Sequence, residues 1–259
     1  MESIDSAGTY VNLITPKVHE DEYRYKLKYK IYSDQTSRFP YTSSRGNQYI
    51  IVICDPDYNV IVVEPLKHCH GAQLAETFNK CCNKLKLKQR ENHLFILDNK
   101  CPKEIQSTIN SLGGMYQLFP PQQHHRNAAE ADIRTFKNHS LSGLATCDPQ
   151  LPIAEWDCLL PQTELTLNFL RNSKINPKLS AWAHLNGMFT FNKTPLLPPG
   201  TKILVHSKPT YHKEFHGQQG WYVAPAPYPY RCMTCYIPSK HREIVSDTIK
   251  IIPNYVPIP

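Results

Sequence analysis

Two acidic residues stand at places in the sequence where a metal-dependent site could be built. Asp98 ends an apolar run, His93–Asp98, whose pattern is typical of a buried strand. Glu130 falls in the first turn of a helix that we expect to open at Asn127. Ligands of strand–helix–strand sheets collect at the carboxyl ends of the strands, so this pair predicts a site at such an edge.

The segment between the two carboxylates has room for one helix and one strand. Apolar residues recur there at helical spacing, and these are Ile105, Ile109 and Leu112. A second apolar run, Met115–Phe119, predicts the strand, which Pro120 and Pro121 stop. The pattern therefore predicts strand, helix, strand and helix in that order from His93 onward.

A third carboxylate, Asp34, lies upstream in the segment Lys30–Pro40. The run Tyr23–Ile31 before it alternates apolar and basic residues, which is the period of a half-buried strand. By this parity Asp34 lies on the same face as Lys28 and Lys30. We expect it on the first strand of the domain.

With their neighbours, these three carboxylates resemble the acidic residues of integrases from retroviruses and from copia- and gypsy-like LTR retrotransposons. In that family the first lies in a strand of the form D-x-T-G-x-x-P, and the second is the Asp of a D-N dipeptide that ends a strand. The third is the Glu of N-x-x-E-x-x-x-R-T-x-K. The matching residues are Asp34, Thr36, Pro40, Asp98, Asn99, Asn127, Glu130, Arg134, Thr135 and Lys137. The resemblance runs from about Lys30 to the C-terminus.

The sequence departs from the family pattern at three positions. Ser37 replaces the usual Gly, Lys100 the usual Gly or Glu after D-N, and Ala131 the common Arg after the Glu. The spacing from Asp98 to Glu130 is a little shorter than the retroviral one. Full retroviral integrases begin with a His-His-Cys-Cys zinc-binding bundle, and no such spacing occurs before Asp34, so we expect that module to be absent.

The resemblance implies an α/β fold, namely an RNase H-like mixed five-stranded sheet with flanking helices, followed by a small C-terminal SH3-like β-barrel. We expect residues 1–20 to be an unstructured lead-in, 21–194 to form the integrase-like core, and 201–259 to form a DNA-contacting barrel. Short strand patterns support the last unit, at Lys202–His206, Gly220–Val223, Arg231–Ile237 and Thr248–Ile252.

Periodicity also predicts the remaining elements of the core. Gln48–Cys54 is apolar on both faces, as in a central strand, and Val60–Val63 follows a turn at Asp55–Asn59. Asp55 and Asp57 are therefore interpreted as turn residues rather than metal ligands. Helices are expected at Ala72–Lys86, Ile153–Arg171 and Asn176–Leu185, the second with an inner face of Trp156, Leu159, Leu160, Thr163, Leu167 and Leu170.

The resemblance assigns a chemistry to the carboxylates. Phosphodiester transfer needs charge neutralised on the attacking and leaving oxygens, which two divalent ions accomplish. Mg²⁺ prefers oxygen ligands, so Asp34, Asp98 and Glu130 would be both its ligands and the catalytic residues, with Mn²⁺ as a possible substitute. Asn99, Asn127, Arg134 and Lys137 would contact nucleic acid, the two basic residues through phosphates.

Bulk properties agree with a nucleic-acid partner. The 259 residues carry a net charge of +7 with a pI near 8.8, which favours polyanions. No apolar run approaches the roughly 20 residues of a membrane span, and Met1–Ser6 shows no secretory signal. Nine scattered cysteines suggest reduced thiols inside a cell. We expect DNA as the partner, homo-oligomers on DNA, no membrane association, and a nuclear location.

A second possible metal motif conflicts with strand geometry. His212 and His216 precede Cys232 and Cys235 with the spacing of a Cys₂His₂ zinc site. Strand alternation would place the two cysteines on opposite faces, however. We therefore expect no bound zinc.

Two functional hypotheses follow, with a third behind them. The first is a retroelement integrase core that carries out metal-dependent 3′-end processing and strand transfer. The alternative is a catalytically degenerate or fragmentary integrase-like protein that retains nucleic-acid binding, which the altered Ser37 and Ala131 favour. The third is another RNase H-like nuclease or transposase. The intact triad favours the first hypothesis.

Overall fold

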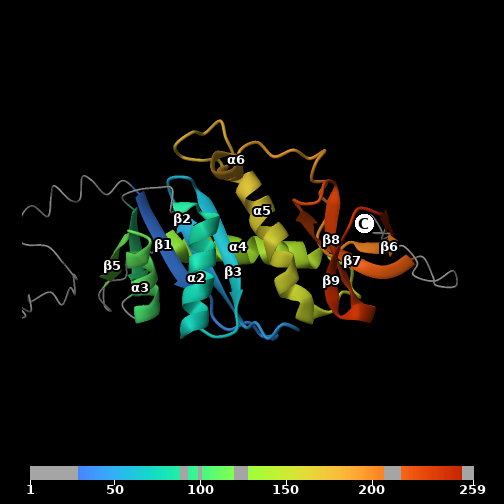
Figure 1. Cartoon of the computed structure of the whole chain (residues 1–259), viewed down its shortest axis with the longest axis horizontal. Coiled ribbons are helices and arrows are strands. Elements are labelled where there is room, and N and C mark those ends of the chain that lie inside the picture. Colours follow the sequence, from blue (N-terminus) through green and yellow to red (C-terminus); the bar gives the residue numbers. More distant parts are fainter. Residues whose placement is uncertain (1–28, 88–92, 99–100, 120–127, 207–216, 253–259) are drawn as a thin grey trace, which may run out of the picture.

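Two five-stranded sheets organise the chain (Figure 1). The computed structural model describes residues 29–87, 93–98, 101–119, 128–206 and 217–252. The first sheet has the strand order β3-β2-β1-β4-β5 and the second has the order β10-β6-β7-β8-β9. The two sheets share no strand: the first is built from residues 29–119 and the second from residues 202–251.

The first sheet is mixed, as predicted. β1 (Tyr29–Gln35), β2 (Tyr49–Asp55) and β3 (Val60–Leu66) form an antiparallel meander, while β4 (His93–Asp98) and β5 (Met115–Phe119) continue it in parallel. The side chains of β2 are buried on both faces after its first residue, which agrees with the unbroken apolar run in its sequence. The predicted mixed sheet is confirmed.

Helices cover both faces of this sheet (Figure 1). α2 (Ala72–Lys84) and α3 (Lys103–Ser111) bury their apolar stripes on one face. α4 (Ala128–Ala145) and α5 (Leu160–Leu170) pack on the other. The short α6 (Ala181–Asn186) begins at Ser180, whose hydroxyl accepts a hydrogen bond from the Ala183 amide. None of the helices in the described ranges is long and apolar enough to span a membrane.

The helix predicted at Ile153–Arg171 has two parts. Residues Ile153–Leu159 form the 3₁₀ helix η2, and α5 begins only at Leu160. Pro161 lies at the start of α5, where its missing N–H costs no helical hydrogen bond. The expected burial of Leu170 on the inner face is wrong, because its side chain is 76% exposed at the end of the helix.

The turn between β2 and β3 is built around a carboxylate. Asp55 Oδ1 accepts hydrogen bonds from the Asp57 amide at 3.0 Å and the Tyr58 amide at 3.1 Å. Such a bond pattern fixes a turn and uses one carboxylate oxygen in doing so. The interpretation of Asp55 as a turn residue is therefore confirmed.

β3 is an edge strand, and α5 covers its free edge with side chains. The Val63 amide donates to Glu164 Oε2 at 2.8 Å, and the Ile61 amide donates to Asn168 Oδ1 at 2.9 Å. Asn168 Nδ2 returns a hydrogen bond to the Ile61 carbonyl at 2.7 Å. Helical positions i and i+4 thus meet alternate residues of the strand, and backbone groups that an edge strand leaves open are satisfied.

The second sheet is antiparallel throughout. Its strands are β6 (Lys202–His206), β7 (Gly217–Ala226), β8 (Cys232–Ile237), β9 (Arg242–Ser246) and β10 (Ile249–Ile251). β9 was not expected, and β7 is longer than expected. β9 and β10 lie at opposite edges of an open sheet, and no pairing within the described residues joins them. The predicted closed SH3-like barrel is therefore not confirmed.

The two sheets are joined by a shared apolar cluster and by an ion cluster. Trp221, Val223 and Tyr236 of the second sheet pack against Cys158 and Leu159 of η2. The guanidinium of Arg45, in the loop after β1, contacts Asp157 at 2.6 Å and Glu243 at 3.2 Å. The predicted division between residues 194 and 201 stays a prediction, but the second sheet rests on the helices of the core.

Gly200 occupies a backbone position that a side chain would disturb. Its φ of 68° favours glycine, and a Cβ there would overlap the Cys147 side chain and lie 3.0 Å from Cys147 Cα. We expect Gly200→Ala to lower the free energy of unfolding by about 3 kcal/mol through backbone strain and overpacking. Urea unfolding followed by circular dichroism measures this.

Gly143→Ala is the matched control for that change. Gly143 lies in α4, and a Cβ at this position would make an ordinary 3.8 Å contact with Pro199. Alanine is the better helix former, so stability should stay equal or rise by up to about 1 kcal/mol. Equal unfolding midpoints for Gly200→Ala and wild type would contradict the packing described for Gly200.

Candidate functional site

Asp34 lies in β1 on the face of the sheet that α4 covers. It pairs with Val52 of β2, and strand alternation places it on the same side as Tyr32. Both Val52 and Tyr32 belong to the cluster that includes Phe136 of α4. The Asp34 side chain is partly buried, and its Oδ1 accepts a hydrogen bond from the Gln35 amide at 2.7 Å.

Asp98 ends the neighbouring parallel strand at the same level. The β1–β4 register pairs Tyr29 with His93 and Tyr32 with Ile96. Continuing this offset by two residues places Asp34 beside Asp98. The structure describes the backbone position of Asp98, at which it pairs with Phe119 of β5, and its side chain lies outside the described part. The fold thus brings two sequence-distant acidic positions onto adjacent strands.

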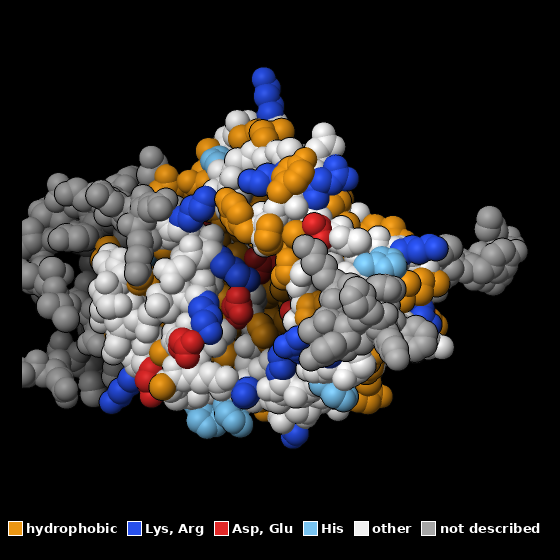
Figure 2. Space-filling model, turned by 45° about the vertical axis from the view of Figure 1, so that its right-hand side comes forward, with side chains coloured by type: hydrophobic (Ala, Val, Ile, Leu, Met, Phe, Trp, Pro, Cys, Tyr) orange, Lys and Arg blue, Asp and Glu red, His pale blue; other side chains and the backbone are white. Residues whose placement is uncertain are grey.

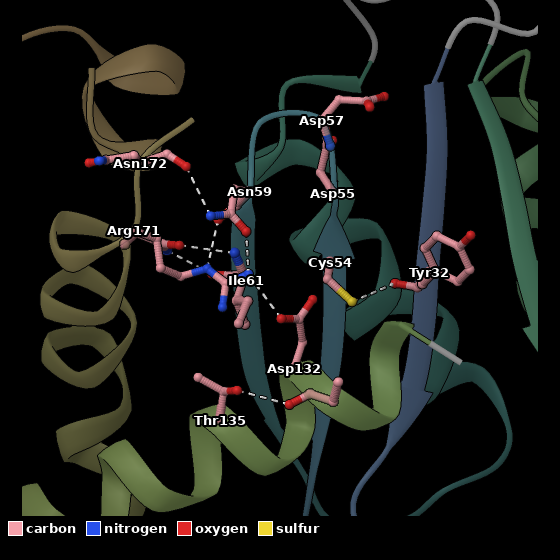
Figure 3. A network of polar contacts seen from close by, with 12 residues as sticks. Tyr32, Cys54, Asp55, Asp57, Asn59, Ile61, Asp132, Thr135, Arg171 and Asn172 are labelled. Atoms are coloured by element: carbon pink, nitrogen blue, oxygen red, sulfur yellow. Dashed lines mark hydrogen bonds and ion pairs between the residues drawn. The ribbon is translucent and has the colours of Figure 1, made fainter. Parts of the chain in front are cut away.

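Glu130 is carried to the same face by α4. Ile133 and Phe136 bury the inner side of this helix against β2, and its path also contacts β1. Figure 3 shows α4 running from the side of β1 past β2 toward α5, so its first turn lies on the β1 side. The Glu130 side chain is exposed, as are Arg134 and, in part, Lys137.

The convergence of the triad stays a prediction. Among the side chains that the structure describes, no group of three His, Cys, Asp or Glu residues gathers as a metal site, and Asp98 is not one of those side chains. Asn99 and Asn127, predicted to contact nucleic acid, lie outside the described residues. The fold places the three acidic positions on two adjacent strands and on the helix that crosses the same face.

A polar network that the sequence did not predict fixes α4 in place near the start of the helix (Figure 3). The Arg171 guanidinium pairs with Asp132 Oδ1 at 2.9 Å and donates to the Asn59 carbonyl at 2.9 Å. Asn59 Nδ2 in turn donates to the Asn172 carbonyl at 2.9 Å. Asp132 lies two residues after Glu130, so this network ties the start of α4 to α5 and to the β2–β3 turn.

We expect a measurable coupling between Arg171 and Asp132. Their side chains are 18% and 15% exposed, so each charge is left poorly solvated when its partner is removed. In a double-mutant cycle with Arg171→Ala and Asp132→Ala, urea unfolding should give a coupling free energy of about 1–2 kcal/mol.

The Glu76–Lys80 pair of α2 provides the control cycle. Its two charges lie 2.8 Å apart but are 66% and 58% exposed, so water screens them. No measurable coupling is expected there. Equal coupling energies in the two cycles would show that Arg171 and Asp132 behave as an ordinary surface pair.

A buried thiol lies on the same face. Cys54 is buried on β2, and its Sγ lies 3.7 Å from the Tyr32 carbonyl. Burial raises the pKa of the Cys54 thiol well above its ordinary value, and the Asp132 carboxylate raises it further. The thiol is therefore neutral near pH 7 and is not an activated nucleophile. No disulfide joins any of the nine cysteines, all of which lie in the described ranges.

Cys232 and Cys235, which have the spacing of zinc ligands, lie on β8. Cys235 is buried in the cluster that contains Tyr222, with which it pairs, while Cys232 pairs with Ala226 nearer the strand's start. His212 and His216 lie outside the described residues. The expectation that no zinc is bound stays a prediction.

Comparisons with known proteins return structures alone. No protein-family model and no curated protein sequence matches the chain. It is similar to a chain of the simian T-cell lymphotropic virus intasome bound to PP2A regulatory subunit B56 gamma, with 13% identity, a TM-score of 0.44, and coverage of 88% of this chain and 83% of that one.

Two catalytic cores are also similar. The BIV integrase core shows 15% identity and a TM-score of 0.42, over 60% of this chain and 92% of that one. The HTLV-2 integrase core, solved with magnesium in a dimeric form, shows 17% identity and a TM-score of 0.43, over 60% and 94%. The TM-scores of these three structures lie below 0.5, and the fold of this chain is defined by its own strand order.

Proposed function

We propose that the chain is an integrase-like polynucleotidyl transferase that acts on DNA and needs Mg²⁺ or Mn²⁺. The observation that carries this proposal is the parallel register of β1 and β4, which sets Asp34 level with Asp98. α4 crosses the same face and carries Glu130 in its first turn. Strand ends of this kind are where ligands collect in α/β sheets.

The donor set suits a hard divalent cation. Three carboxylates offer only oxygen ligands, which Mg²⁺ and Mn²⁺ prefer over nitrogen or sulfur. Asp34, Asp98 and Glu130 would hold the metal, which when bound would stabilise charge on the phosphate oxygens during transfer. The HTLV-2 integrase core was solved in complex with magnesium, which supports the choice of metal.

The exposed side of α4 would bind the substrate. Arg134 and Lys137 follow Glu130 by four and seven residues, so the three side chains share one stripe of the helix. Cations beside the acidic site would hold DNA phosphates and fix the position of the strand, without reading its sequence. The net charge of +7 favours the same partner.

A strand-transfer assay tests the proposal. Purified protein is incubated with blunt duplex ends and a supercoiled target, with Mg²⁺, with Mn²⁺, and with EDTA. We expect joined products with either metal and none with EDTA. Joining in EDTA would exclude metal-dependent transfer, and binding without joining under every condition would favour the alternative.

That alternative is a degenerate integrase-like protein that binds nucleic acid without catalysis. Ser37 and Ala131 favour it, because both stand where the resembled family has other residues beside its acids. Binding measured by fluorescence anisotropy would then persist unchanged in EDTA. For an active site that uses metal, binding of the DNA end should strengthen when metal is added.

We infer that the second sheet contacts the DNA backbone as part of a barrel-like unit. We also infer that the chain acts in the nucleus, where it assembles as a homo-oligomer on DNA. Two similar structures are an intasome and a dimeric integrase core, which supports the proposal of a homo-oligomer. Mass photometry with and without duplex ends tests this, and monomers in both samples would contradict it.

A further inference from the structure

A cluster of aromatic side chains lies at the C-terminal end of α5. Phe169 lies 4.8 Å from Phe189 and 5.8 Å from Trp182 between ring centroids, and Phe189 lies 4.9 Å from Phe191. The rings meet edge to face or tilted, which is the favoured packing of aromatic groups. Four rings from three short segments therefore form one apolar surface cluster.

Much of this surface is exposed. Phe191 is 60% exposed, and the neighbours of the cluster along the chain, Leu170 and Met188, are 76% and 79% exposed. Single exposed apolar residues are common, but several large ones around a packed aromatic cluster indicate an interaction surface. We call Phe169, Leu170, Trp182, Met188, Phe189 and Phe191 the aromatic patch.

The charged residues in the sequence segment that carries the aromatic patch are all basic. No Asp or Glu occurs in the sequence between Glu164 and Glu214, whereas Lys174, Lys178 and Lys193 do. Lys193 lies over the exposed Tyr228 ring, with its ammonium 5.0 Å from the ring centroid. In Figure 2 hydrophobic side chains at the top of the molecule are bordered by basic ones.

A hollow adjoins the aromatic patch. Trp182 also lines a cavity of about 200 Å³ together with Leu185, Val60 and Val62. Glu164 and Lys84 also line this hollow, and Lys84 pairs with Glu164 at 2.9 Å and with Glu64 at 2.8 Å. The apolar wall of the hollow, formed by Val60, Val62, Trp182 and Leu185, can take a bulky side chain of a partner beside the ring cluster.

We propose that the aromatic patch docks a protein partner that presents an acidic segment with bulky apolar anchors. The apolar anchors would cover the rings and the hollow, and the acidic residues would face Lys174, Lys178 and Lys193. The exposed Leu170 and Met188 add aliphatic area that cannot stack on bases but suits the apolar anchors of a protein partner. The proposal does not depend on the proposed function.

Selection from a displayed library of random peptides tests the chemistry of the partner. The full chain is immobilised, and selected peptides are sequenced and resynthesised for affinity measurement. We expect enrichment of Asp and Glu beside Leu, Phe or Trp. The double variant Met188→Ser/Phe191→Ser should weaken binding of the selected peptide at least tenfold, and Lys193→Glu several-fold with a reduced dependence on salt.

Leu141→Ser is the matched control, because Leu141 is 62% exposed on α4 and outside the aromatic patch. It should bind like wild type, and thermal melting checks that all variants fold. Peptides without acidic enrichment, or equal binding by the double variant, would overturn the proposal. So would displacement of the peptide by single-stranded oligonucleotide, or a dimer that the double variant dissociates, which would assign the aromatic patch to nucleic acid or to a second copy.

Discussion

We expect an Asp98→Asn variant to carry out strand transfer at a rate lower by a factor on the order of 100 or more. Removing a single group that stabilises charge in a transition state lowers enzyme rates by a factor of this size. The exchange keeps the size of the side chain and removes its negative charge. Asp98 ends β4 at the level of Asp34, where we propose that the metal binds. Asp34→Asn and Glu130→Gln should act alike, since each removes one oxygen ligand that carries charge.

The same variants should bind DNA as well as wild type or better, because each removes a negative charge that faces phosphate. Asp57→Asn is the control, since Asp57 belongs to the turn after β2 rather than to the proposed site. It should retain transfer. Wild-type transfer by Asp98→Asn, with a normal unfolding curve, would defeat the assignment of the site.

Asn168→Leu is expected to lower the free energy of unfolding by about 3 kcal/mol, since unpaired buried polar groups cost about 1–3 kcal/mol each. Asn168 is 2% exposed, and its amide serves both the amide and the carbonyl of Ile61 on the edge strand. Leucine has the same branched heavy-atom skeleton but no polar atoms, so two backbone groups would lose their partners without a cavity being left. Urea unfolding measures the loss.

Asn138→Leu makes the same exchange at an exposed position of α4. It should leave stability within about 0.5 kcal/mol of wild type, as surface substitutions usually do. If both asparagine variants unfold at the same urea concentration, the side-chain cover of β3 does not contribute to stability.

The core sheet could be predicted because its patterns are local. Strand alternation and unbroken apolar runs locate the central strands, and the acidic residue at the end of β4 follows from the D-N motif. The predicted burial of Leu170 was wrong because helical periodicity does not show where the helix passes beyond the sheet. β9 was missed because its residues are mostly exposed or half-buried, so the strand has no apolar face to reveal it.

The candidate site could be predicted only in part. The motifs find Asp34, Asp98 and Glu130, but no local signal pairs Arg171 with Asp132, since only the packing of α5 beside α4 brings them together. The aromatic patch was equally hidden. Its members come from α5, α6 and the segment after α6, and each residue alone resembles an ordinary core residue.

The side-chain cover of β3 also determines how the sheet can grow. Unprotected edge strands recruit further strands from other molecules, which leads to fibrils or swapped dimers. Because Glu164 and Asn168 occupy the hydrogen-bonding groups of β3, that side of the sheet is closed to such recruitment. Cleavage or truncation that removes α5 would therefore do more than shorten the chain. It would leave β3 as an unprotected edge strand that can pair with strands of other molecules. The products should therefore precipitate rather than remain as a smaller folded core.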